Sequence, residues 1–295
     1  MSGGETMDGI LIIDKPIGMT SHDVVYKVRK SLAEKRIGHT GTLDPNASGV
    51  LVLCVGTATK LVKYFTEHDK TYLAGIDVGY RTDTYDLEGT VQEVKRCETL
   101  TDAIVDETLR TFLGSSSQIP PDYSAIRVDG KKLYEYARKH QVMPEIQPRP
   151  IQIEKLNRTT PVIVTDGVAH FNFFVHCGKG MYVRALCRDI GLRLGSVATM
   201  TDLRRLRVGE FTLEEAAPLA TVLSGQVELK DPIPYLGMPR LSIDEATRRL
   251  VLNGVFLPVA LFSDTQDTIL MNGSVALAIY TYDDTIKMMR LSVLF

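Results

Sequence analysis

One carboxylate in this chain, that of Asp44, lies in a short loop with the sequence GHTGTLDP, residues 38–45. A residue that precedes a proline is disfavoured in helical conformation, and glycines adopt backbone angles that other residues avoid. Such a loop can present its carboxylate to a cleft, and loops on a rigid scaffold often carry catalytic groups. Because Asp-Pro is more often an ordinary turn, the loop alone leaves a catalytic and a structural interpretation open.

Two other side chains, Arg184 and Tyr72, could complete a reactive site. Arg184 lies in the first turn of a helix that apolar residues mark at helical spacing. The helix dipole opposes a cation at this position by about 0.3–1 kcal/mol, and an anionic partner would offset that cost. Tyr72 lies on the apolar side of an alternating strand, residues 71–78, which by pattern alone makes it a core residue.

Short motifs flank this loop along the chain. They are LIIDKPIGMTS at 11–21, GVL at 49–51, GTATK at 56–60, KTY at 70–72, RTDTYD at 81–86, PPDYSA at 120–125 and GKGMYVR at 178–184. In this order and spacing they resemble the motifs of the bacterial tRNA pseudouridine-55 synthases, the TruB family. The resemblance covers roughly residues 8–215, and the remainder of the chain matches more loosely.

The resemblance implies the isomerisation of uridine 55 in the T loop of tRNA. The bond from ribose C1′ to base N1 breaks, the base turns, and C5 bonds to C1′. The family assigns the nucleophile to the aspartate that matches Asp44 and pairs it with the arginine that matches Arg184. The tyrosine that matches Tyr72 stacks on the extracted base. Attack by Asp44 on C1′ and attack on C6 both stay open.

Further substrate-binding residues follow from the same resemblance. His39 matches a histidine that fills the space of the displaced base, and Tyr182 and Leu203 match residues that line the uracil pocket. Lys15 matches a lysine that supports the cleft. By residue pattern alone, His39 could equally be a polar loop residue, and Tyr182 and Leu203 could be core residues.

A long polar segment at about residues 120–150, bounded by prolines, looks like an insertion that stands off the core. It resembles the mobile RNA clamp of the family. Its basic residues include Lys131, Lys132, Arg138 and Lys139, and Arg149 at its base could contact a backbone phosphate.

The charge distribution adds to this interpretation. The net charge of −2 does not by itself indicate a nucleic-acid-binding protein. However, residues 176–207 carry a net charge of +5 and residues 127–149 a net charge of +3, whereas residues 208–295 carry −5. Basic clusters can follow phosphates, although most are solvated helix faces.

We expect a cytoplasmic protein that works without a membrane, a metal or a cofactor. The apolar runs are too short to span a bilayer, and residues 1–6 lack the features of a signal peptide. The implied isomerisation is neither a redox reaction nor a phosphoryl transfer, so it requires no cofactor and no metal. No two cysteines form a Cys-x-x-Cys pair, which argues against zinc. The expected partner is the T stem-loop of tRNA, with no obligatory protein partner, and the chain is expected to be a monomer.

A chain of 295 residues suggests one large domain and a smaller one, or two domains. Sequence patterns predict a mixed α/β protein, and the resemblance implies a pseudouridine synthase fold (α+β) with a long, mainly antiparallel central sheet. We expect this catalytic domain at residues 1–235 and a small β-rich, PUA-like domain at 236–295. Residues 218–239 look like a linker region, and Ser242 with Glu245 predicts a capping box for a helix that ends at Gly254.

Other function classes have weaker support. The chain has no GxxxxGK[ST] phosphate loop and no GxSxG nucleophile elbow, and its glycines at 178 and 180 lack the rest of a dinucleotide fingerprint. The non-enzymatic alternative is a tRNA-binding RNA chaperone that remodels the T arm. A related enzyme works through guide RNA and partner proteins, whereas the insertion at 120–150 favours direct recognition of tRNA.

Overall fold

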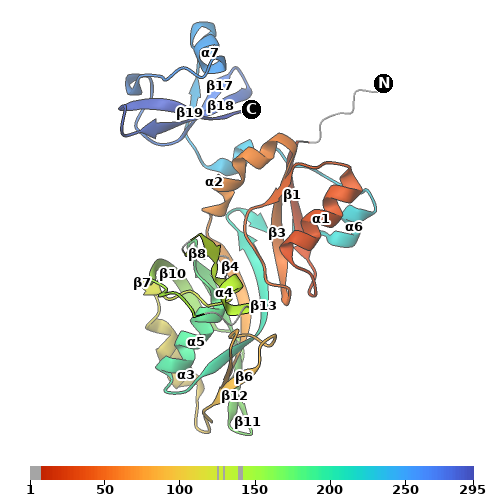
Figure 1. Ribbon diagram of the computed structural model, residues 1–295, viewed down its shortest axis with the longest axis vertical. Coiled ribbons are helices and arrows are strands. Elements are labelled where there is room, and N and C mark those ends of the chain that lie inside the picture. The colour runs from red at the N-terminus through yellow and green to blue at the C-terminus, as the bar shows by residue number, and fades with distance from the viewer. Residues whose placement is uncertain (1–7, 125, 129, 139–141) are drawn as a thin grey trace.

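The computed structural model describes residues 8–124, 126–128, 130–138 and 142–295. Ala125 of the PPDYSA motif and Lys139 of the insertion lie outside the described residues. Two sheets organise the described chain, a large one that forms the body and a small one near the C-terminal end (Figure 1).

The large sheet extends from β15 at one edge to β7 at the other. Its strands in spatial order are β15 (Ala217–Pro218), β1 (Gly9–Lys15), β3 (Ala47–Val55), β13 (Ala198–Val208), β4 (Lys70–Val78), β12 (Val168–Cys177), β10 (Arg149–Arg158) and β7 (Gly114–Gln118). Beside this path β2 (Ile37–His39), β14 (Phe211–Thr212) and β11 (Ile163–Thr165) pair with β3, β13 and β12. Among the described strands of this sheet only the pairs β1–β15 and β3–β13 are parallel. The predicted fold class, mixed α/β with a long, mainly antiparallel sheet, is therefore confirmed.

Helices cover the large sheet in two places. α1 (Ser21–Leu32) and α6 (Leu219–Leu223) pack together beside β1, whereas α3 (Asp102–Arg110) and α5 (Val183–Arg193) pack on β10 and β13 (Figure 1). α1 starts where Thr20 and Asp23 form a capping box, and Val24 and Val28 supply its buried face. No helix in the described part of the chain is long and apolar enough to cross a membrane.

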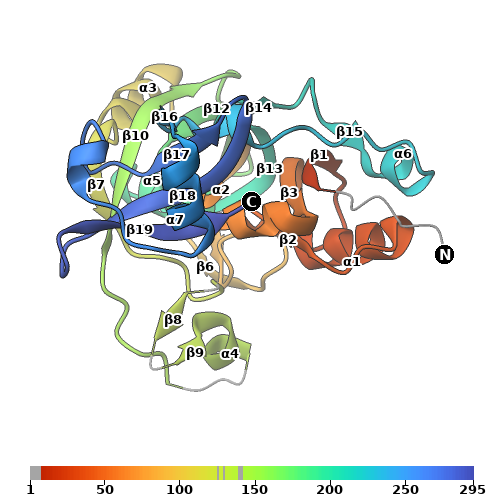
Figure 2. The ribbon, with the colours of Figure 1, turned by 90° about the horizontal axis from the view of Figure 1, so that it is seen from above.

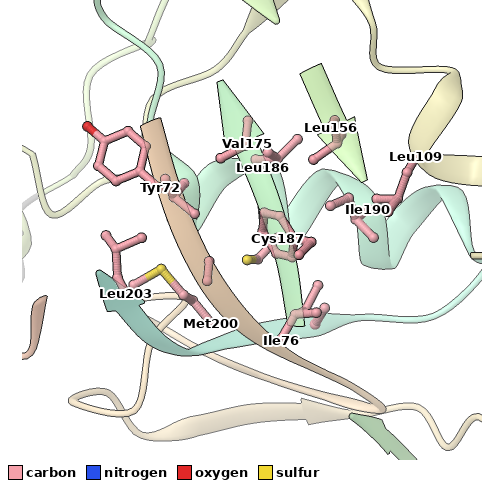
Figure 3. Packing of buried hydrophobic residues seen from close by; sticks show 14 of the residues in the cluster. Tyr72, Ile76, Leu109, Leu156, Val175, Leu186, Cys187, Ile190, Met200 and Leu203 are labelled. Carbon is pink, nitrogen blue, oxygen red and sulfur yellow. The ribbon is translucent and has the colours of Figure 1, made fainter. Parts of the chain in front are cut away.

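The apolar core beside α5 fixes one end of the site. Leu186 and Ile190 of α5 pack with Ile76 of β4 in a cluster of buried side chains (Figure 3). Tyr72 and Leu203 lie at one end of that cluster, and the hydroxyl of Tyr72 is directed away from the other labelled side chains (Figure 3). The core therefore determines where this tyrosine stands.

The small sheet has the order β16 (Arg240–Ser242), β17 (Thr268–Asn272), β18 (Val275–Asp283) and β19 (Met288–Leu294), and α7 (Glu245–Leu252) accompanies it. It contacts the body through η1 (Gly56–Leu61) and α2 (Val62–Thr66). The Tyr64 hydroxyl lies 2.8 Å from Ser292 Oγ, and Lys60 Nζ donates to the Leu294 carbonyl at 2.6 Å. Buried Phe65 joins an apolar cluster that includes Val293, so α2 links the two sheets.

The insertion forms a small unit that stands away from the large sheet (Figure 2). It contains β8 (Arg127–Val128), β9 (Lys131–Lys132) and α4 (Leu133–Arg138). Leu133 is buried, whereas Lys131 is exposed, with its Nζ 5.6 Å from the centre of the Tyr136 ring. A second hairpin, β5 (Tyr80–Thr82) with β6 (Val91–Val94), follows β4.

Two sequence predictions in the C-terminal part are wrong. Residues 218–239 are not a free linker, because Leu219 and Val222 of α6 are buried in the core beside α1. The N-cap of α7 is Asp244 rather than Ser242, since the Asp244 carboxylate accepts a hydrogen bond from the N–H of Thr247 at 2.8 Å. An aspartate two residues further along the chain accepts a hydrogen bond from a backbone N–H of the first turn. The helix therefore starts later than the predicted capping box requires.

Gly49 allows the two parallel strands β3 and β13 to meet. It lies opposite Arg205 in the strand register and has a φ of +106°. A Cβ at this position would lie 2.1 Å from the Arg205 carbonyl oxygen. Only glycine therefore fits, and the contact fixes Arg205 beneath the loop that carries Asp44.

Gly49→Ala should destabilise the protein by roughly 3–5 kcal/mol, because backbone strain and steric overlap add. Gly195→Ala is the matched control, since Gly195 also has a positive φ of +73° but has open space where a Cβ would lie. It should cost only about 1–2 kcal/mol. Urea denaturation measures both values, and equal losses would contradict the steric argument.

Candidate active site

The loop that carries Asp44 joins β2 to β3 and is held by hydrogen bonds to the start of α1. The hydroxyl of buried Ser21 accepts from the N–H of Leu43 at 2.8 Å and donates to the Leu43 carbonyl at 3.1 Å. The N–H of Gly18 donates to the Pro45 carbonyl at 2.9 Å. The backbone on both sides of Asp44 is therefore fixed, whereas its side chain is 34% exposed.

Lys15 supports the same loop from inside the protein. Its side chain is buried, and Nζ donates to the carbonyl oxygens of Met19 at 2.6 Å, Pro16 at 2.9 Å and Pro45 at 3.4 Å. Burial lowers the pKa of Lys15 to about 8, and the nearby Asp44 carboxylate acts in the opposite direction. These contacts are those of a residue that supports the cleft wall.

Arg205 is a second buried cation under the loop, and the sequence analysis did not identify it. It is only 2% exposed, and its guanidinium donates to the carbonyls of Val50 at 2.7 Å, Gly41 at 3.1 Å and Thr42 at 3.4 Å. Burial lowers the pKa of Arg205, and the neighbouring Tyr72 side chain acts in the opposite direction. The strand period of two could have found Arg205, because it lies two residues after Leu203 and therefore on the same face.

The predicted ion pair between Arg184 and Asp44 is present. Nε of Arg184 lies 2.9 Å from Oδ2 of Asp44. The two terminal nitrogens donate to the carbonyls of Thr84 at 3.1 Å and Tyr123 at 3.0 Å. The Arg184 side chain is only 7% exposed, so the guanidinium of this ion pair is largely shielded from water.

A second carboxylate, that of Asp86, shares this guanidinium. Its Oδ2 lies 3.5 Å from Nε of Arg184, and its Oδ1 accepts from Thr84 Oγ1 at 2.6 Å and from the N–H of Glu88 at 3.0 Å. Asp86 is 6% exposed. The RTDTYD motif contains it, but the sequence did not show that its carboxylate would reach Arg184.

These side chains meet at one cleft of about 540 Å³. The predicted site residues that line it are Asp44, Tyr72, Tyr182, Arg184 and Leu203. Residues that line it without a predicted role include His22, Lys70, Asp86, Glu88, Ser124 and Arg205. A cleft of this size is in the range of small-molecule sites and can hold a nucleoside.

The other predicted contacts lie outside the described wall of this cleft. Lys131 is exposed on the insertion, and the backbone of Lys132 follows it in β9. Arg149 is exposed at the start of β10. Burial raises the pKa of Tyr182, which lines the cleft, and the charge of Arg149 acts in the opposite direction. Arg149 is therefore near the cleft, although it is not one of the described residues that line the cleft.

Two family models match the chain. Residues 29–183 match the TruB family pseudouridylate synthase N-terminal domain, and residues 184–236 match the tRNA pseudouridylate synthase B C-terminal domain. The chain belongs to the TruB family. It is 43% identical over 263 residues to tRNA pseudouridine synthase B of Bacillus pumilus (strain SAFR-032), covering 86% of this chain and 84% of that relative. The corresponding protein of Halalkalibacterium halodurans is 41% identical over 283 residues, 93% of this chain and 92% of the relative.

Solved structures share the fold of this TruB family member. The Cbf5-Nop10-Gar1 complex contains a chain with a TM-score of 0.66 and 24% identity, and the match covers 97% of this chain and 84% of that one. An H/ACA RNP bound to a substrate RNA containing 2′-deoxyuridine gives a TM-score of 0.66 at 22% identity, over 97% and 83% of the two chains.

His39, predicted from the family to fill the space of a displaced base, is not among the described residues that line the cleft. It lies in β2, and its ring packs edge-on against that of His22, which does line the cleft, with 5.0 Å between centroids. Its buried Nδ1 has no partner among the described residues. Burial, and then the charges of His22 and Arg205, lower the pKa of His39 to about 4, so its ring is neutral at pH 7.

The positive charge of residues 176–207 is largely neutralised within the fold. Arg204 lies 2.9 Å from Asp14, Arg207 lies 2.7 Å from Asp69, and Arg188 lies 2.8 Å from Asp189. Arg184 and Arg205 are the buried cations described above. The net charge of this segment therefore overstates the number of cations that are free to bind phosphates.

His39→Gln should make the fold less sensitive to acid. The folded protein keeps His39 neutral down to about pH 4, whereas an unfolded imidazole binds a proton below about pH 6.5. Between these values the unfolded state binds more protons, so wild-type stability falls as the pH falls. From pH 7 to pH 4.5 the wild type should lose about 2–3 kcal/mol more unfolding free energy than the variant. Urea denaturation at both pH values measures this difference, and equal losses would reject it.

Proposed function

We propose that this chain is a tRNA pseudouridine synthase that converts uridine 55 of the T loop, with Asp44 as the nucleophile. The observation that carries the proposal is the Arg184–Asp44 ion pair in a cleft beside Tyr72. The relatives at 41% to 43% identity are tRNA pseudouridine synthases B, which supports tRNA pseudouridylation as the activity. Uridine 55 follows from the family that the motifs resemble.

In this mechanism, Arg184 holds Oδ2 of Asp44 and leaves Oδ1 for the substrate. Among the described residues, Oδ1 has no hydrogen-bond donor. Its attack at C1′ or at C6 allows the bond from C1′ to N1 to break. The base then turns, C5 bonds to C1′, and the bond between Oδ1 and the nucleoside breaks, which frees Asp44. C5 loses a proton and N1 gains one, so the product is an isomer of the substrate. The reaction consumes no oxidant and no phosphoryl donor, and we propose that it needs no cofactor.

Tyr72 supplies the surface against which the base turns. Extraction of a base from its loop costs a few kcal/mol, and stacking on an aromatic ring returns about 1–3 kcal/mol. Burial raises the pKa of the Tyr72 hydroxyl, and Arg205 beside it lowers that pKa. The phenol is therefore protonated when the substrate enters, and the guanidinium is placed to stabilise a phenolate if the hydroxyl gives up its proton.

Tyr182 and Leu203 complete the wall around the base. On the insertion, Lys131 and Lys132 would hold the RNA, and Arg149 would bind its backbone. With these residues as the contacts to the T arm, we propose that the chain acts alone, as a cytoplasmic monomer. The alternative is an RNA chaperone that binds and remodels the T arm without isomerising it.

Tritium release from a tRNA transcript labelled at C5 of uridine tests the function. The purified wild type should release tritium and form one pseudouridine, at position 55. Asp44→Asn should lose at least roughly 10³-fold in turnover and keep its tRNA affinity, because only the nucleophile is removed. Asp77→Asn is the control. Asp77 of β4 pairs with His170 of β12 away from the cleft wall, so this variant should remain active. If the wild type bound tRNA but released no tritium, only the chaperone function would remain.

Arg184→Lys should slow turnover by about 10-fold to 100-fold and leave tRNA affinity unchanged. A lysine keeps the charge but cannot hold Asp44 and the carbonyls of Thr84 and Tyr123 at once, so Asp44 loses its fixed direction. Arg188→Lys is the matched control, because Arg188 lies one turn later on α5 and binds Asp189 instead. Single-turnover rates measure the effect. Equal rates in wild type and Arg184→Lys would exclude an orienting role for Arg184.

A further inference from the structure

Lys70 is a buried cation that lines the cleft but has no part in the mechanism above. It begins β4, two residues before Tyr72, and is 8% exposed. Its ammonium donates to the carbonyls of Thr66 at 2.7 Å and His68 at 2.5 Å, at the end of α2. An ammonium has three donors, so one N–H is left without an acceptor in the part of the chain that the structure describes.

The carboxylates nearest to Lys70 already have other partners. Asp69 binds Arg207 at 2.7 Å and His176 at 3.2 Å, and Glu67 pairs with Lys179. Among the described residues, Lys70 itself forms no ion pair. A buried charge without a counter-ion is costly, and an anionic ligand would offset that cost.

The cleft near Lys70 has room for such a ligand. Lys70 pairs with Cys177 across β4 and β12, and the turn that follows Cys177 brings Gly178 and Gly180 into the cleft wall. Gly180 has a φ of +79° and open space where a Cβ would lie. The N–H groups of Gly180 and Met181 have no acceptor among the described residues, so this turn offers donors on the wall of the same cleft.

We propose that Lys70 and the turn at residues 178–181 bind one backbone phosphate of the RNA substrate, at a linkage next to the nucleotide that enters the cleft. The proposal rests on the proposed function, because it assumes that RNA occupies this cleft. Lys70 and Tyr72 are about 6.6 Å apart along the strand, so the ammonium lies beyond the edge of a base stacked on Tyr72. A base carbonyl is neutral and would leave the charge of Lys70 unpaired, whereas a phosphodiester neutralises it.

The titration of Lys70 agrees with this geometry. Its pKa is lowered to about 8, by burial first and then by the charge of Arg205, while Cys177, Asp69 and Glu67 act in the opposite direction. The ammonium is therefore poorly compensated in the free protein. A bound phosphate would favour its charged form.

Methylphosphonate substitution tests the proposal, because it removes the charge of one phosphate at a time. A T-arm hairpin would carry this neutral linkage on either side of the target uridine. One of the two substitutions should weaken binding to the wild type by about 10-fold to 100-fold. Lys70→Met should bind the unmodified hairpin more weakly than the wild type does, by the same factor. The neutral linkage should not weaken binding to this variant any further. For Lys70→Met, the slope of log affinity against log salt concentration should be smaller in magnitude than for the wild type by about 0.7.

Lys230→Met is the matched control, because Lys230 pairs with Glu215 outside the cleft and should keep the linkage penalty. If Lys70→Met fails to fold, Lys70→Arg replaces it, and this variant should retain the penalty at the same linkage. No penalty at either linkage in the wild type would overturn the proposal. A Lys70→Met protein that still showed the full penalty would also overturn it. The proposed function fails by a different result, the absence of pseudouridine from the bound, unmodified hairpin.

Discussion

The site depends on an ion pair that places a partly exposed carboxylate, that of Asp44, at the cleft. Arg184 forms this pair through Nε, at 2.9 Å from Asp44, while its other nitrogens are occupied by carbonyls of two separate loops. A guanidinium suits this task because its donors form a rigid planar fork. The same cation lies in the first turn of α5, where the helix dipole opposes it, so its two carboxylate partners also stabilise the helix start.

Buried cations that bind carbonyl oxygens surround the cleft. Lys15 and Arg205 lie beneath the loop of Asp44, and Lys70 lies at the end of α2, each with carbonyl acceptors and no carboxylate within ion-pair distance among the described residues. Such groups cost free energy when buried, which is why the pKa of each is lowered. Their hydrogen bonds to carbonyl oxygens fix irregular backbone around the cleft.

The fold is shared with chains of low sequence identity. Chains in two solved structures have TM-scores of 0.66 with this one at 22% and 24% identity. Relatives at 41% and 43% identity cover most of its length. The insertion that contains β8, β9 and α4 stands off the large sheet, and segments of this kind vary more readily than the elements of a core.

The sequence by itself determined the local features of this protein. Glycine, proline and alternating apolar residues fixed the Asp44 loop, the strand of Tyr72 and the helix that starts near Arg184, because these depend on the backbone preferences of a few neighbours. Only the tertiary structure decided which distant groups meet. That Arg205 lies opposite Tyr72 on the neighbouring strand, that Asp86 shares Arg184 and that His39 packs against His22 follow from the tertiary arrangement of strands and helices. These contacts depend on how separate elements pack against one another, which short-range patterns do not encode.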